Sequence, residues 1–104
     1  PHTAPPRVIS MNPYQTKIIT GFMNLHGAEC VELYVTAAGT ASATIADEFS
    51  VMISATGRVS YHMFDRDRWW VKHRSDSLPA VIHPNGQTER WEYGIKRRDR
   101  ITYM

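Results

Sequence analysis

The stretch that decides the fold runs from residue 69 to residue 99 and consists of WWVKHRSDSLPAVIHPNG (69–86) followed by QTERWEYGIKRRD (87–99). A tryptophan-rich run is followed by basic residues and an acid, then by an apolar run and the dipeptide Asn85-Gly86. A second tryptophan run and a second basic cluster come next. Asn and Gly both tolerate positive φ, so this order predicts a region of β-hairpins over residues 69–99. Such hairpins build scaffold and surface, and these contain no obvious catalytic apparatus.

Within this stretch, His73-Arg74, Asp76, the run Leu78 to Ile82 and Asn85-Gly86 follow one another in a distinctive order. The order resembles a short repeat, a variant of the MORN repeat, found in many copies in giant-virus proteins and in one or two copies in small phage proteins. The match is degenerate, about one and a half copies, because no Asn-Gly precedes His73 and Arg97 stands where a second unit would carry His. The resemblance implies a viral or phage-like origin and a β-hairpin architecture, but no particular activity.

The N-terminal half predicts one helix followed by strands. Asn12-Pro13 is typical of a helix start, with Asn at the N-cap and Pro at the first helical position, and Gly27 is typical of a helix end. The apolar face expected for this helix, residues 13–26, consists of Tyr14, Ile18, Phe22 and Leu25. Alternating apolar residues on both sides of Thr56-Gly57 predict a hairpin over residues 49–64.

These elements predict a single α+β domain over residues 1–104, with the N-terminal helix packed on a twisted antiparallel sheet of hairpins. Residues 1–10 are rich in proline and are expected to form an extended arm, and residues 101–104 are expected to form a last strand. Cys30, the only cysteine, is expected to be a small buried apolar side chain in a strand. The expected core consists of Ile18, Phe22, Leu33, Val35, Val51, Ile53, Val59, Tyr61, Val81 and one of Trp69 or Trp70.

Composition indicates the compartment and the kind of partner. A single cysteine excludes an intrachain disulfide, which favours a cytoplasmic location, in the host cytoplasm if the protein is viral. No apolar run approaches the roughly 20 residues that span a bilayer, so no membrane partner is expected. Residues 1–57 hold two cations and four anions, a charge of −2, whereas residues 58–104 hold ten cations and six anions, a charge of +4. This asymmetry favours an anionic partner for the C-terminal half.

The residue pattern does not favour an enzyme. There is no glycine-rich phosphate loop, no nucleophile elbow and no carboxylate pair in an apolar setting. His62, His73 and His83 are spaced without a close metal-binding pair, so no metal and no cofactor are expected.

Tryptophan and arginine are the residues most enriched where protein surfaces bind partners. We therefore expect a basic, tryptophan-bearing face that binds a host protein, as an inhibitor of a defence or nucleic-acid-processing complex. Two alternatives stay open, namely nucleic-acid binding by stacking and phosphate contacts through the same face, and assembly of a homo-oligomer through strand edges. The candidate contacts are Trp70, Lys72, Arg74, Trp91, Arg97 and Arg98.

Overall fold

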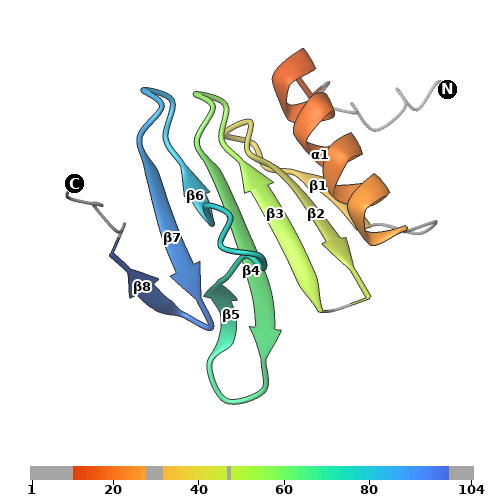
Figure 1. Cartoon of the computed structure of the whole chain (residues 1–104). Coiled ribbons are helices and arrows are strands. Elements are labelled where there is room, and N and C mark those ends of the chain that lie inside the picture. The colour runs from red at the N-terminus through yellow and green to blue at the C-terminus, as the bar shows by residue number, and fades with distance from the viewer. Residues whose placement is uncertain (1–10, 28–31, 47, 99–104) are drawn as a thin grey trace, which may run out of the picture.

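The computed structural model describes residues 11–27, 32–46 and 48–98. In chain order the elements are α1 (Pro13–His26), β1 (Glu32–Val35), β2 (Ala41–Ile45), β3 (Phe49–Ile53), β4 (Val59–Asp65), β5 (Trp69–Lys72), β6 (Val81–Ile82), β7 (Thr88–Glu92) and β8 (Ile95–Arg97). All strand pairs are antiparallel, and α1 lies across one face of the eight-stranded sheet (Figure 1). The predicted α+β class is confirmed. The expectations for residues 1–10, Cys30 and residues 101–104 lie outside the described residues.

The sheet is a meander in which one strand position is shared by two short strands. β4 pairs with β5 along its second half and with β6 at its beginning, so β5 and β6 lie end to end between β4 and β7 (Figure 1). Backbone hydrogen bonds join both ends of the connection between β5 and β6 to β7, from Arg74 N–H to the Trp91 carbonyl and from Ala80 N–H to the Glu89 carbonyl. Residues 73–80, which connect β5 to β6, therefore leave the sheet as a loop, called the 73–80 loop below.

The helix begins and ends where the sequence predicts. Asn12 and Gln15 form a reciprocal capping box, and Gly27 closes the helix in the left-handed conformation. The buried face of the helix is rotated about the helix axis relative to the predicted face. Tyr14 and Leu25, which were expected to be buried, are 42% and 69% exposed. Phe22 is buried as predicted, and the other buried residues of α1 are Gln15 and Ile19.

Gln15 explains this rotation. Its side-chain amide donates hydrogen bonds to the backbone carbonyls of Gly39 at 2.8 Å and Ile53 at 2.9 Å, while its Oε1 accepts from the Asn12 N–H at 3.0 Å. Burial of a polar side chain is tolerated when its hydrogen bonds are satisfied in this way. A pattern of apolar residues alone does not indicate such a position.

The core lies between α1 and the strands β2, β3 and β4. Its buried members are Ile19, Phe22, Ala41, Ala43, Val51, Ile53 and Val59, with Ile18, Val35, Tyr61 and Ile82 among the partly buried residues packed against them. The prediction for Leu33 is wrong, since it is 53% exposed on β1 at the edge of the sheet. Small residues on β2 let the helix approach, which the alternation of larger residues did not indicate.

The two faces of the sheet differ in their cover. One face, called the helix face, carries α1, and successive strand residues alternate between it and the opposite, open face. By register the open face carries Tyr34, Met52, Phe64, Trp70, Lys72, Val81 and Trp91. Val81 is fully buried as predicted, but it lies on this open face and outside the cluster under the helix.

Among the described residues, no helix has the length and apolar character needed to cross a membrane.

Candidate functional site

The β4–β5 hairpin ends in a turn that is held by its own side chains. Asp65 Oδ1 accepts hydrogen bonds from the backbone N–H groups of Asp67 at 2.8 Å and Arg68 at 3.1 Å, and Arg68 forms an ion pair with Asp65 Oδ2 at 3.0 Å. The bond from the Asp67 N–H is the main reason that the pKa of Asp65 is lowered. Figure 1 shows that this hairpin extends beyond the end of β3, away from α1.

Three aromatic side chains gather at the end of this hairpin. The ring centroid of Phe64 lies 6.1 Å from that of Trp69 and 5.4 Å from that of Trp70, with both pairs edge-to-face. Trp69 is 70% exposed, Trp70 37% and Phe64 36%. These residues are called the hairpin-tip cluster. The prediction that one tryptophan fills the core is wrong, because β5 pairs with the part of β4 that α1 does not cover.

The backbone of Trp69 explains how two consecutive indoles contact one ring. Consecutive strand residues normally point to opposite faces, but Trp69 has a φ of 69°, in the left-handed region, which interrupts that alternation. The hairpins β1–β2, β3–β4 and β6–β7 place glycine at their left-handed position, namely Gly39, Gly57 and Gly86. A left-handed conformation costs a residue with a Cβ about 1–2 kcal/mol. The most exposed tryptophan therefore occupies a position that glycine fills in those three hairpins, whereas Ala46 and Tyr93 are left-handed in the β2–β3 and β7–β8 connections.

The structure brings together three of the six predicted contact residues. Trp70, Lys72 and Trp91 share the open face, and the ammonium of Lys72 lies 4.6 Å from the centroid of the Trp91 ring. The indole N–H of Trp91 donates to Glu89 Oε1 at 2.9 Å, and His83 Nε2 lies 2.6 Å from Glu89 Oε2. The hydrogen bond with His83, followed by that from Trp91, lowers the pKa of Glu89 to about 2. Trp91 is therefore held in the sheet by its neighbours.

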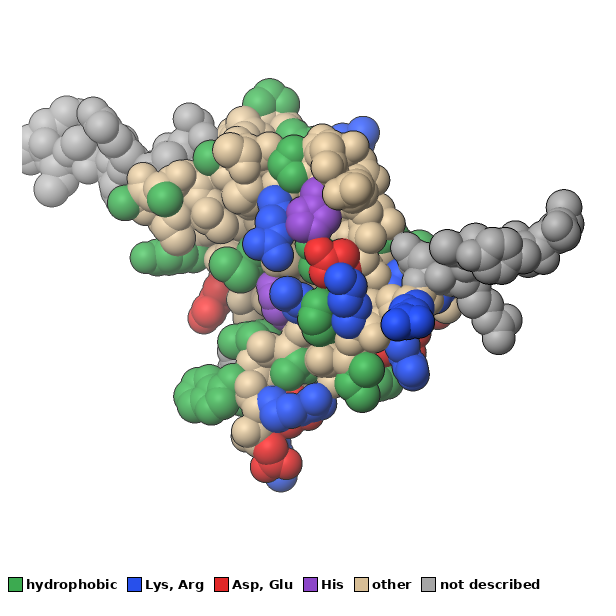
Figure 2. Space-filling model, turned by 90° about the vertical axis from the view of Figure 1, so that its left-hand side faces the viewer, with side chains coloured by type: hydrophobic (Ala, Val, Ile, Leu, Met, Phe, Trp, Pro, Cys, Tyr) green, Lys and Arg blue, Asp and Glu red, His purple; other side chains and the backbone are tan. Residues whose placement is uncertain are grey.

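The other three predicted residues lie elsewhere, so the six do not form one face. Arg74 lies on the helix face, where its guanidinium carbon is 4.1 Å from the centroid of the Tyr61 ring. Arg97 and Arg98 are exposed at the β8 edge, where Arg97 lies 3.9 Å from a Glu92 oxygen. Figure 2 shows this edge, with Lys and Arg side chains gathered among carboxylates and histidines. The 73–80 loop carries Arg74 out of the sheet, which the regular alternation of a strand did not predict.

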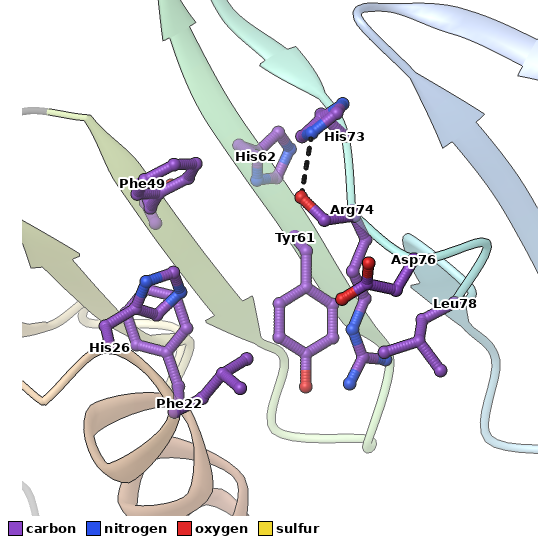
Figure 3. Close-up of a pocket in the computed structure, with 12 residues that line it drawn as sticks. Phe22, His26, Phe49, Tyr61, His62, His73, Arg74, Asp76 and Leu78 are labelled. Carbon is purple, nitrogen blue, oxygen red and sulfur yellow. Dashed lines mark hydrogen bonds between the residues drawn. The ribbon is translucent and has the colours of Figure 1, made fainter.

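A groove of about 220 Å3 lies on the helix face, between the end of α1 and the 73–80 loop. Figure 3 shows Phe22, His26 and Phe49 on one side and Arg74, Asp76 and Leu78 on the other, with Tyr61 between them. His26 stacks on Phe49 with ring centroids 4.8 Å apart. The lining is mainly aromatic and aliphatic, with a few polar groups, as is usual for a ligand site.

His73 fixes the loop that forms one wall of this groove. It is 8% exposed, its Nδ1 accepts the Tyr93 N–H at 3.0 Å, and its Nε2 lies 3.4 Å from Ser75 Oγ. Burial lowers the pKa of His73, because the charged imidazolium is poorly solvated in this position. Two further residues of the loop, Asp76 and Ser77, have φ values of 63° and 58°. This wall of the groove therefore contains a buried histidine that anchors the loop and a turn with two left-handed residues.

The three histidines considered for a metal site are placed differently from one another. His73 lies within the groove wall, His62 is opposite Lys72 on the open face, and His83 pairs with Glu89. Burial is the main cause of the lowered pKa of His62, followed by the charges of Lys72 and Arg58. In residues 11–27, 32–46 and 48–98, no group of three or more His, Cys, Asp or Glu side chains could hold a metal ion.

Two exposed aromatic residues of the hairpin-tip cluster, Phe64 and Trp69, were not among the predicted contacts. Phe64 falls on the outward positions of the alternating pattern in β4, so its exposure could have been found. The exposure of Trp69 could not have been found, because the turn Asp65–Arg68 contains no Gly or Asn that would indicate a left-handed residue after it.

Comparisons of the chain with protein-family models, curated proteins and solved structures found no match.

Proposed function

We propose that this protein is a non-enzymatic binding protein that attaches to a partner protein through the hairpin-tip cluster. The observation that carries the proposal is Trp69, a large apolar side chain that is 70% exposed on a left-handed residue. Strain of this kind is retained at functional sites when the surrounding structure supports it. A glycine at the same position would remove both the strain and the exposed indole.

The chemistry of the cluster suits a protein surface. Tryptophan is the residue type most enriched at binding hot spots, and aromatic rings provide a large contact area with few torsions to immobilise. Phe64 contacts both Trp69 and Trp70, and all three stay at least partly exposed, which forms a contiguous apolar patch on a projecting hairpin. Charged residues of the turn, Asp65 to Arg68, supply the polar rim that is usual around such patches.

The hairpin is also organised before it meets a partner. Three contacts to the Asp65 carboxylate hold the turn, and four residue pairs join β4 to β5. A rigid binding element loses little conformational entropy on association. This supports recognition by a preformed hairpin rather than by a segment that folds on binding.

The partner we propose is a host protein, and the effect we propose is inhibition of a defence or nucleic-acid-processing complex in the host cytoplasm. This part of the proposal is supported by the phage and viral repeat that residues 69–99 resemble. Inhibition of this kind needs only a surface that is complementary to the partner, and the hairpin-tip cluster is the surface that we propose.

Nucleic-acid binding is a second candidate, favoured by the basic β8 edge in Figure 2. Two of its cations already have carboxylates nearby, since Lys96 lies 3.7 Å from Glu89 and Arg97 lies 3.9 Å from Glu92. Such pairing reduces the positive potential that a phosphate backbone would meet. The hairpin-tip cluster therefore ranks first.

The test is capture from nuclease-treated bacterial lysate, with mass spectrometry of the retained proteins and titration of the purified partner. The variant is Trp69→Gly with Trp70→Thr. The matched control is Tyr34→Thr, which removes an aromatic residue that is 65% exposed at the opposite edge of the sheet. We expect one partner to be retained by the wild type and by the control, and its affinity to fall by about 2 kcal/mol or more in the double variant.

Undiminished affinity in the folded double variant would contradict the proposal. An equal loss of affinity in Tyr34→Thr would indicate that exposed aromatic residues bind the partner non-specifically. Retention of DNA or RNA that falls steeply with added salt would favour the second candidate. Light scattering of the purified protein separates both from a homo-oligomer formed through strand edges.

A further inference from the structure

We infer that the groove between α1 and the 73–80 loop binds a small amphipathic carboxylate, with an apolar body between the helix and the loop and its charge at Arg74. The groove lies on the helix face, whereas the proposed protein contact is at the end of the β4–β5 hairpin, so this inference does not depend on the proposed function.

The first argument is the unbalanced charge of Arg74. Its Nη1 donates to the Pro79 carbonyl at 3.1 Å, and its Nε is buried without a hydrogen-bond partner. Nη2 forms no hydrogen bond, and Arg74 forms no ion pair, within the part of the chain that the structure describes. A partly buried guanidinium that forms no ion pair attracts carboxylates, which it binds through strong charge-assisted hydrogen bonds.

The second argument is the position of this charge. The guanidinium carbon lies 4.1 Å from the centroid of the Tyr61 ring and Nη1 bonds to the Pro79 carbonyl, so these contacts hold the guanidinium at the groove wall. Arg74 thus lines the same groove as the apolar side chains of Phe22, Phe49 and Leu78. A ligand that satisfies both features needs an anionic group next to an apolar body.

The size of the groove limits that body. About 220 Å3 is less than the roughly 300–1,000 Å3 of sites that hold drug-sized ligands, so a single ring or short chain fits. Phe22, Phe49 and His26 present aromatic surfaces on the helix side, which favour a flat apolar group.

Asp76 sets the sharpest test, because it is the carboxylate that lines the same groove. It is exposed and forms no ion pair among the described residues. Its negative charge opposes that of a bound carboxylate, so its removal should strengthen binding while removal of Arg74 weakens it. The two neutral substitutions therefore change the affinity in opposite directions.

The probes are 4-phenylbutyrate and its uncharged analogue 4-phenylbutan-1-ol, titrated into the full chain and followed by amide chemical shifts. For the wild type we expect the carboxylate to bind about tenfold more tightly than the alcohol, with shifts centred on the groove. Arg74→Gln should abolish this preference, and Asp76→Asn should raise it by about threefold. Arg58→Gln removes the same charge as Arg74→Gln at an exposed position outside the groove and should leave the preference unchanged.

Equal affinity for the two probes, no binding at millimolar concentration, or a preference retained in folded Arg74→Gln would overturn the inference. Arg74 contacts Tyr61 and Pro79, so its variant carries a risk of misfolding. In that case Asp76→Asn and Arg58→Gln decide, because the inference fails if the first leaves the preference unchanged or if the second abolishes it.

Discussion

Replacing Trp69 by glycine and by alanine gives a direct test of the strained hairpin tip. Both substitutions remove the same indole and the same contact with Phe64, and only alanine keeps the Cβ that makes a φ of 69° unfavourable. In a regular strand the order is the reverse, since glycine is about 0.5–1 kcal/mol less favourable than alanine. We expect Trp69→Gly to be more stable than Trp69→Ala by about 1 kcal/mol.

The cost common to both variants follows from burial. Because 70% of Trp69 is exposed, the side chain buries on the order of 60 Å2, which at about 25 cal/mol per Å2 corresponds to roughly 1.5 kcal/mol as an upper estimate. Trp69→Ala should lose about this amount, whereas Trp69→Gly should recover most of it through relief of the strain. In thermal unfolding, the difference between the variants is about 4–8 °C in Tm.

The assay is urea and thermal unfolding of both variants, with the pair Tyr34→Gly and Tyr34→Ala as the control. Tyr34 lies in the extended strand β1, so alanine should be the more stable residue there. If alanine is as stable as glycine at position 69, or if both positions give the same order, the left-handed strain assigned to Trp69 is refuted.

Three further predictions concern stability. Gln15→Leu should cost about 2–3 kcal/mol in urea unfolding, since it leaves buried carbonyls without a donor, and a loss below about 1 kcal/mol would contradict the role given to Gln15. The pKa of Glu89 is lowered from 4.5 to about 2, so its contribution to stability is complete above pH 4.5 and is lost as the pH falls towards 2; Glu89→Gln should flatten the stability curve in that window. The pKa of His73 is lowered in the folded state, so the unfolded chain takes up its proton first and stability should fall as the pH decreases below about 6.5. His73→Gln should weaken this dependence, and an NMR titration midpoint above 6.5 for His73 would exclude it.

Local signals in the sequence were sufficient for the helix and for the hairpins around Gly57 and Asn85-Gly86. Asn12-Pro13 and Gly27 define the helix because the first and last turns depend on caps that lie next to them in the chain. The hairpins around Gly57 and Asn85-Gly86 were predictable for the same reason, since turn geometry depends on a few adjacent residues. The α+β class follows from these elements, which must bury one face of a helix against one face of a sheet.

Only the tertiary structure decided which side chains face the core, the open face and the groove. Gln15 is buried because carbonyls more than twenty residues away accept its hydrogen bonds, and both tryptophans of β5 are exposed because α1 covers another part of the sheet. Arg74 leaves its expected face because the chain between β5 and β6 departs from the sheet. Periodicity reports only how side chains alternate along one element, whereas burial depends on which other element lies above it.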